Sequence, residues 1–166
     1  DFDYGVRING DNIFLNPPTL HAMLAIAETD QFDFVTNVPG RTFPYGMSVE
    51  IVRRSWYESV LPMMSNPAYR EHVTNWLYEN PELGLRYVYR NRDCPEAAGL
   101  QLALDTPEDL QRVSEILSQA DSDPVSLDLP KIHDLITRPA MTSPWQGKAG
   151  PLLIAEIGGN HEGDFD

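Results

Sequence analysis

Two aspartates in this chain follow short apolar segments and are suited to bind a hard cation. Asp11 stands in RINGDN and Asp105 stands in LALDTPEDL, each just after a segment of strand-forming residues. Open α/β sheets bind ligands outside the carboxyl ends of their strands, and Mg²⁺ prefers oxygen ligands. Two such carboxylates can together hold Mg²⁺ against a triphosphate. Taken singly, each also has a structural interpretation, an Asx-type turn at Asp11 and a residue before a helix cap at Asp105.

Three further positions have side chains or backbone suited to binding a ligand. Gly10 allows close approach of a ligand to the backbone. Arg41, in RTFPYG, has a guanidinium fork that suits a carboxylate or a phosphate. Glu50 lies in the middle of a predicted strand, between Val49 and Ile51, and points either to a pocket or to solvent.

A third group of candidates lies on a helix that Asn66 and Pro67 are predicted to start. The apolar stripe of this helix is Tyr69, Val73, Trp76 and Leu77. The candidates are Arg70, Glu71 and His72. His72 is one step off the stripe, a boundary position that is structural or exposed in the simpler interpretation. Arg70 and Glu71 form a solvated face in that interpretation.

Composition excludes several classes of function. The 166 residues include 25 acids and 12 bases, a net charge of −13, with no basic cluster, so we expect no nucleic-acid partner. The single cysteine, Cys94, excludes a disulfide framework and a thiolate cluster and favours a cytoplasmic setting. No apolar run reaches membrane-spanning length, so we expect no membrane partner.

Strand-like and helix-like segments alternate along the first part of the chain. Strands are expected at residues 4–8, 32–38, 48–52, 85–89 and 100–104, and helices after Pro17, Ser55, Asn66 and Thr106. This alternation predicts an α/β layered domain with a largely parallel sheet. Residues 121–150 are rich in Ser, Pro, Gly and Asp and are interpreted as a tail and linker, with a short helix near 132–136. A new strand is expected from Leu152.

In order and spacing, several segments resemble the bacterial cytidylyltransferases of the spore-coat-polysaccharide type, which are related to the enzymes that make CMP-sialic acid and CMP-Kdo. These segments are RINGDN, FVTNV, RTFPYGMSVEI, NPAYREHVTNWLYENPE and LALDTPEDLQRV. For residues 1–120 the resemblance implies a Rossmann-like nucleotidyltransferase (nucleotide-diphospho-sugar transferase) fold, a three-layer αβα architecture that is N-terminally truncated. The family's opening glycine-rich and basic loop, which cradles the CTP phosphates, has no counterpart here.

The resemblance also implies a reaction and its residues. A sugar hydroxyl or phosphate oxygen would attack the α-phosphate of CTP and release pyrophosphate, with Mg²⁺ (or Mn²⁺) as cofactor. Asp11 and Asp105 match the catalytic metal-binding aspartates, and Gly10 lies at the nucleotide. Positions near the acceptor-sugar pocket match Arg41, Glu50, Arg70, Glu71 and His72. Ser48 departs from the family, which has an acid there.

The last residues, PLLIAEIGGNHEGDFD, resemble the first strand and loop of the sialic acid synthase family. That family has a (β/α)₈ barrel and condenses phosphoenolpyruvate with an N-acetylated amino sugar. Glu156 would correspond to an acid of its substrate site. Residues 151–166 would then begin a barrel, joined to the transferase by the linker 121–150. We therefore expect a segment of a longer bifunctional protein for acidic-sugar biosynthesis, with the fragment alone inactive.

The expected partners are CTP and either an acidic sugar (a nonulosonic acid) or a sugar phosphate, and analogy with relatives suggests a homodimer.

Three alternatives to these expectations stay open. A transferase for another nucleotide is the first alternative, because the base-reading segment is expected upstream. A degenerate, non-catalytic domain that acts as a scaffold for a sialic acid synthase is the second, favoured by Ser48 and opposed by Asp11 and Asp105. A simple tail strand and turn is the alternative for residues 151–166.

Overall fold

The computed structural model describes residues 2–120, 127–137, 146–147 and 150–151. The chain divides into a compact unit, Asp1–Ile136, and a second unit, Thr137–Asp166. In the second unit the structure describes two short strands, β5 (Gln146–Gly147) and β6 (Gly150–Pro151), which pair antiparallel. All of the remaining architecture described below belongs to the compact unit.

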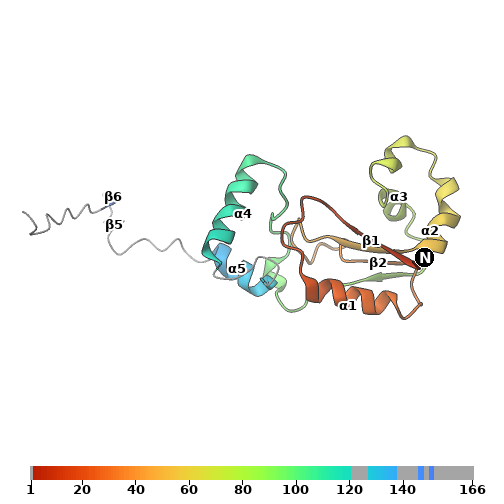
Figure 1. The fold of residues 1–166 in the computed structure, drawn as a ribbon, viewed down its shortest axis with the longest axis horizontal. Helices are drawn as coiled ribbons and strands as arrows, with labels where there is room; N and C mark the ends of the chain where they lie inside the picture. Colours follow the sequence, from red (N-terminus) through yellow and green to blue (C-terminus); the bar gives the residue numbers. More distant parts are fainter. Residues whose placement is uncertain (1, 121–126, 138–145, 148–149, 152–166) are drawn as a thin grey trace, which may run out of the picture. The chain divides into compact units, whose positions relative to one another are not determined.

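A four-stranded sheet forms the centre of the compact unit (Figure 1). Its strands are β1 (Tyr4–Ile8), β2 (Phe34–Thr36), β3 (Val49–Arg53) and β4 (Arg86–Val88), in the order β1-β3-β2-β4. β3 runs antiparallel to β1 and β2, while β4 runs parallel to β2. The prediction of a largely parallel sheet is therefore wrong for these strands. No helix separates β2 from β3, so the chain returns beside β2 without the crossover that a parallel pair needs.

Helices cover both faces of this sheet, which confirms the α/β layered architecture. On one face lies α1 (Pro17–Ala27), and on the other lie α2 (Arg54–Val60) and α3 (Asn75–Glu79) (Figure 1). Alternate strand residues serve the two faces, since successive side chains of a strand point in opposite directions. The cluster on the α1 face is Met23, Ala27, Val35, Val49 and Ile51. The cluster on the opposite face is Phe34, Val52, Val60, Trp76 and Leu77.

The N-termini of the helices show which predicted caps are present in the structure. Asn16 caps α1, its side chain accepting a hydrogen bond from the backbone N–H of Thr19 at 2.8 Å, as the prolines after it predict. The predicted cap at Ser55 is wrong, because α2 begins at Arg54, directly after β3, without a side-chain cap. Asn66 does cap, accepting from the N–H of Ala68 at 3.0 Å.

The helix predicted to follow Asn66 is divided. A 3₁₀ turn, η2 (Pro67–Arg70), comes first, and α3 begins only at Asn75. Two further 3₁₀ turns are η1 (Leu61–Met63) and η3 (Pro95–Ala97). The break leaves Val73 exposed, so only Trp76 and Leu77 of the predicted stripe are fully buried in the core.

The segment 100–104 is not the regular strand that its apolar residues predict. It makes two isolated bridges instead, Asn12 with Ala103 and Tyr45 with Gln101. Leu102 is buried in a second core, beneath α4 (Pro107–Gln119) and α5 (Leu129–Thr137). The segment thus connects the turn after β1 with the loop before β3, and both carry candidate site residues.

Part of the predicted linker belongs to the compact unit. Within 121–150, α5 buries Leu129, Ile132 and Leu135 in the same core as Phe14 and Leu102. The compact unit accordingly extends to Ile136, beyond the predicted boundary at residue 120. Residues 121–126, 138–145 and 148–149 of the predicted linker lie outside the described residues.

Two glycines, Gly46 and Gly99, allow a test of how closely the loop before β3 packs against the segment 100–104. Gly46 has φ +84°, and a Cβ there would lie 2.4 Å from the backbone nitrogen of Ala103. We expect Gly46→Ala to lower the free energy of unfolding by at least about 2 kcal/mol, because conformational strain adds to this overlap. Gly99, with φ +75° and no atom within 4 Å of such a Cβ, is the matched control.

For Gly99→Ala we expect a loss of only about 1 kcal/mol, since strain alone remains. Urea unfolding of both variants measures the difference. Equal losses would show that the contact between Gly46 and Ala103 does not limit the packing of this loop.

Candidate functional site

The carboxyl ends of three strands meet at one edge of the sheet. The register pairs Ile8, the last residue of β1, with Val49, the first residue of β3. It also aligns Thr36, the last residue of β2, with Glu50 and with Val88 of β4. The turn that follows β1 carries Gly10 and Asp11. Asp11 therefore lies where the sequence predicts, just beyond a strand's carboxyl end.

The structure brings the backbone segments of Asp11 and Asp105 together. The backbone N–H of Leu104 donates to the carbonyl oxygen of Asp11 at 3.3 Å, and the next residue pair, Asn12 and Ala103, forms a β-bridge. Asp11 is half-buried and Asp105 is exposed. The two carboxylates, which are far apart in sequence, thus extend from adjoining segments, as a shared cation site requires.

The Asp11 carboxylate has an unusual environment. Its Oδ1 atom is buried and has no hydrogen-bond partner among the residues that the structure describes. A buried carboxylate oxygen without a partner is costly unless a cation or a donor compensates it. Asp105 keeps its Oδ2 engaged with the side-chain amide of Gln101 at 2.9 Å. Carboxylate oxygens of this kind fit Mg²⁺ or Mn²⁺, and Asp11 and Asp105 are the residues that would hold it.

The turn beside these carboxylates is open. No atom of the described chain lies within 4 Å of a Cβ built on Gly10. A ligand can therefore approach this backbone closely, as the predicted nucleotide contact at Gly10 needs.

The rest of the DTPED motif is structural. Thr106 and Asp109 form a capping box, in which the Thr106 side chain accepts from the Asp109 N–H and the Asp109 carboxylate accepts from the Thr106 N–H at 3.0 Å. The Asp105 carboxylate is not part of this capping box and bonds instead to the side-chain amide of Gln101. The motif therefore combines a helix start with an acid held just in front of it.

This cap leads to a pH-dependent prediction. The hydrogen bonds from Thr106 are the main reason that the pKa of Asp109 lies below its ordinary value of 3.8. Folding thus favours the carboxylate, so its stabilising contribution is present above pH 3.8 and is lost as the pH falls through the lowered pKa. We expect Asp109→Asn to remove this part of the acid dependence, measured by thermal unfolding from about pH 5 to about pH 2.

Two variants complete this test. Thr106→Ala should lower the free energy of unfolding by about 1 kcal/mol at neutral pH, because the side chain that caps α4 is lost. Glu108→Gln, at an exposed neighbouring acid in the same turn, is the control and should keep the acid dependence of the parent chain. An acid dependence that survives Asp109→Asn would contradict the role given to this carboxylate.

Glu50 is buried, with 3% of its surface exposed, so the interpretation that it points to solvent is wrong. It forms an ion pair with Arg7, its cross-strand neighbour on β1. The hydroxyl of Tyr78 donates to its Oε1 at 2.6 Å. That hydroxyl also lies 2.8 Å from Oγ1 of Thr36, and Arg7 donates to Oγ1 of Thr74 at 3.3 Å. Burial, above all, and then the charge of Glu50 raise the pKa of Tyr78, which keeps the phenol protonated as a donor.

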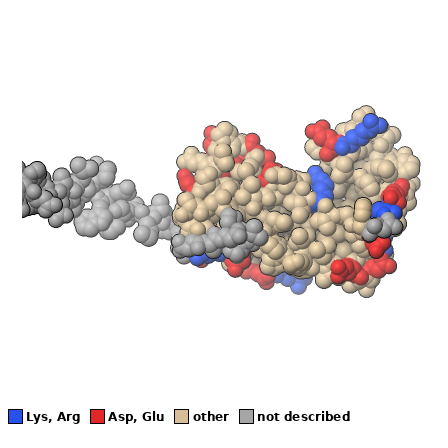
Figure 2. All heavy atoms as spheres, in the orientation of Figure 1, with Lys and Arg blue, Asp and Glu red and all other residues tan. Residues whose placement is uncertain are grey.

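Arg7 is the charged partner of Glu50 in this cluster, and the sequence does not indicate it. Its side chain is 31% exposed, so part of it reaches solvent while the guanidinium pairs with a buried acid. Figure 2 shows the surface hollowed between α4 and the part that carries α2 and α3. A charged group held in this way is suited to bind an anionic substrate at the surface.

The other predicted residues do not join the Arg7–Glu50 cluster. Arg41 lies in a loop with φ +44° and places its guanidinium carbon 4.0 Å from the centre of the Tyr45 ring. Arg70, Glu71 and His72 are exposed in and after η2, two to four residues before Thr74. Glu156 lies outside the described residues.

The comparisons with known proteins define the class of fold first. A solved structure of a cytidylyltransferase from Leptospira borgpetersenii matches with a TM-score of 0.70 and 27% identity, over 81% of this chain and 55% of that chain. The compact unit therefore has the Rossmann-like nucleotidyltransferase fold of a cytidylyltransferase, as predicted. No protein-family model matches the chain.

Two curated proteins are similar to this chain in sequence. The spore coat polysaccharide biosynthesis protein SpsF of Bacillus subtilis is 27% identical over 126 residues, 72% of this chain and 49% of that protein. An uncharacterized protein of Methanocaldococcus jannaschii is 26% identical over 136 residues, 82% of this chain and 54% of that protein. The chain thus spans about half the length of the curated relatives it matches. The predicted resemblance to a sialic acid synthase rests on residues that, from 152 to 166, lie outside the described part.

None of the described helices is both long enough and apolar enough to span a membrane.

Proposed function

We propose that this chain supplies part of the active site of a cytidylyltransferase that activates an acidic sugar. An oxygen of the sugar attacks the α-phosphorus of CTP, the bond from that phosphorus to the bridging oxygen breaks, and pyrophosphate leaves with the electron pair. A hydroxyl that attacks gives its proton to solvent. The observation that carries the proposal is the buried Oδ1 of Asp11, which has no hydrogen-bond partner in the described part of the chain and lies on the segment beside that of Asp105.

The two aspartates would hold Mg²⁺ or Mn²⁺, which when bound supplies charge neutralisation at the phosphates. The chain's own residues then act by positioning. The turn at Gly10 lets a phosphate approach the backbone, and the carboxylates of Asp11 and Asp105 fix the place of the cation. Positioning of this kind is the main protein contribution in phosphoryl-type transfer.

The acceptor side of the proposal rests on the Arg7–Glu50 cluster. Arg7 offers a guanidinium at the surface, which suits the carboxylate of an acidic sugar. Glu50 pairs with that guanidinium, and the hydroxyl of Tyr78 in turn holds the Glu50 carboxylate by a hydrogen bond. We include Arg41, Arg70, Glu71 and His72 as outer contacts of the same substrate, on the strength of the resemblance to cytidylyltransferases.

We further propose that the protein is a bifunctional one, in which residues 151–166 begin a sialic acid synthase barrel. A synthase of this kind makes the acidic sugar that a cytidylyltransferase activates, so the two activities follow one another. The measured mass of the native protein tests this part, because a chain near 18.7 kDa could not contain a barrel.

The activity is tested on the full-length protein with Mg²⁺. Pyrophosphate release is measured with each of the four nucleoside triphosphates, with acidic sugars or sugar phosphates as acceptors, and products are identified by mass spectrometry. We expect release with CTP and a CMP-linked acidic sugar as product. Preference for another nucleotide would contradict the cytidylyl assignment. No release with any nucleotide would instead support a scaffold, the role that Ser48 favours in place of the usual acid.

A further inference from the structure

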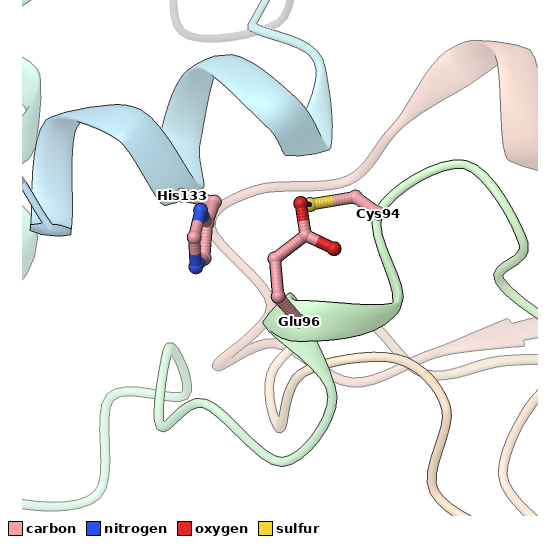
Figure 3. A group of neighbouring side chains, drawn as sticks. All are labelled: Cys94, Glu96 and His133. Carbon is pink, nitrogen blue, oxygen red and sulfur yellow. Dashed lines mark hydrogen bonds between the residues drawn. The ribbon is translucent and has the colours of Figure 1, made fainter.

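A second group of ligand-type side chains shares no residue with the aspartate pair or with the Arg7–Glu50 cluster. It consists of Cys94, Glu96 and His133. The sulfur, a carboxylate oxygen and an imidazole nitrogen all lie within 4.8 Å of one another. Figure 3 shows the carboxylate of Glu96 between the sulfur of Cys94 and the ring of His133. Residues from two separate elements, η3 and α5, thus meet at one point.

The backbone holds these side chains in place. Cys94 precedes η3 and is fixed by Asn91, whose amide donates to the Cys94 carbonyl at 2.6 Å and whose Oδ1 accepts from the Cys94 N–H at 3.1 Å. His133 stands on α5 between two buried anchors, Ile132 and Leu135. The group is therefore positioned by elements that pack in the core rather than by flexible loops alone.

We propose that Cys94, Glu96 and His133 form a binding site for Zn²⁺ or a divalent transition metal with similar ligand preferences, such as Co²⁺. Thiolate, carboxylate and imidazole are the three ligand classes that Zn²⁺ takes in proteins. The Cys94 sulfur lies 3.3 Å from Oε1 of Glu96. Tetrahedral Zn²⁺ with ordinary bond lengths would separate such a sulfur and oxygen by about 3.6 Å. Only a small adjustment therefore lets the two atoms share one ion.

The charge and the softness of the ligand atoms distinguish this site from the carboxylate site at Asp11. A thiolate and a carboxylate together balance the charge of a divalent ion, and a sulfur ligand disfavours Mg²⁺. Burial is the main cause that raises the pKa of the Cys94 thiol, and the neighbouring Glu96 carboxylate raises it further. Without metal the sulfur therefore keeps its proton, and on binding this proton leaves to solvent as the sulfur–metal bond forms.

The surroundings leave room for a further ligand. Glu96 is exposed and His133 is half-buried, so the site opens toward solvent on that side. Three protein ligands with an open position can be completed by water, as in many zinc sites. Binding would tie η3 to α5.

The test uses the full chain, without a histidine tag, in excess Mg²⁺, with Co²⁺ as the spectroscopic probe and Zn²⁺ as its competitor. A thiolate ligand gives Co²⁺ a charge-transfer absorption in the near ultraviolet. We expect this absorption to saturate at an equimolar ratio and to disappear when Zn²⁺ is added. His133→Asn and Glu96→Gln should weaken Co²⁺ affinity by at least about tenfold, since even the loss of an outer-shell partner costs that much.

Two controls keep the test decisive. His21→Asn, on the exposed side of α1, should bind as the parent chain does. Cys94→Ser should lose the absorption, but Cys94 is fully buried and this variant could unfold, so the variants of His133 and Glu96 decide the test. Absence of the absorption in the parent chain overturns the proposal. Parent-like affinity in both His133→Asn and Glu96→Gln also overturns it, because the thiol would then bind alone.

Discussion

Replacing Asp11 by Asn is expected to abolish nucleotidyl transfer in the full-length protein while leaving the fold intact. The loss should be at least about 10²-fold in kcat, the scale of removing one group that stabilises charge in a transition state. The free energy of unfolding should stay the same or rise, because a neutral group replaces a carboxylate whose buried oxygen has no partner among the residues described. Pyrophosphate release measures the first effect and thermal unfolding the second.

Asp105→Asn should produce a similar loss of activity, since its segment joins that of Asp11 at the same edge. Glu108→Gln is the matched control, an exposed acid three residues farther along that should leave the activity unchanged. If Asp105→Asn keeps parent-like transfer, the proposed cation site is wrong. If Asp11→Asn loses activity only because it unfolds, the site assignment loses its support, and the melting curve shows which has happened.

The second large effect concerns stability. Arg7→Met should lower the free energy of unfolding by about 3 kcal/mol, because it leaves Glu50 buried without its cationic partner. The hydroxyl of Tyr78 still donates to Glu50, which keeps the loss at the lower end of the range for broken buried pairs. Urea unfolding at neutral pH measures it.

The control is an arginine that pairs at the surface. Arg54 lies 3.2 Å from Glu58 in an i,i+4 pair whose acid is 62% exposed, so Arg54→Met should lower the free energy of unfolding by less than about 1 kcal/mol. A double-mutant cycle of Arg7→Met with Glu50→Gln should show coupling above about 1 kcal/mol, since the second change removes the unpaired charge. Equal losses for Arg7→Met and Arg54→Met, or no coupling, would contradict a buried pair that matters for folding.

Local signals account for what the sequence could predict. The helices that begin at Pro17 and Pro107 were predictable because an Asn or Thr cap and a proline both act within one turn. The strands at 4–8 and 49–53 were predictable from their β-forming residues. The expectation that Asp11 and Asp105 come together rests on a rule about strand ends, and the structure places their segments side by side.

Other features depend on contacts between segments far apart in the chain. The sequence places Glu50 among apolar neighbours but does not show that β1 lies beside β3 and so brings Arg7 to it. The helix predicted after Asn66 is divided into η2 and α3, and the side chains of Thr74 and Tyr78 bond to the Arg7–Glu50 cluster, which no local pattern predicts. Sequence composition made 121–150 resemble a linker, but α5 supplies core residues.

The sequence alone thus determined the helix starts at Asn16 and Thr106 and the place of Asp11 after β1, because these depend on residues within a few positions of each other. Tertiary structure decided strand direction, the pairing of Glu50 with Arg7, and the meeting of Cys94 and Glu96 with His133. The physical reason is that burial and cross-strand register are properties of the packed chain. A charged side chain is either solvated or paired according to which strand or helix lies beside it, and no local pattern contains that information.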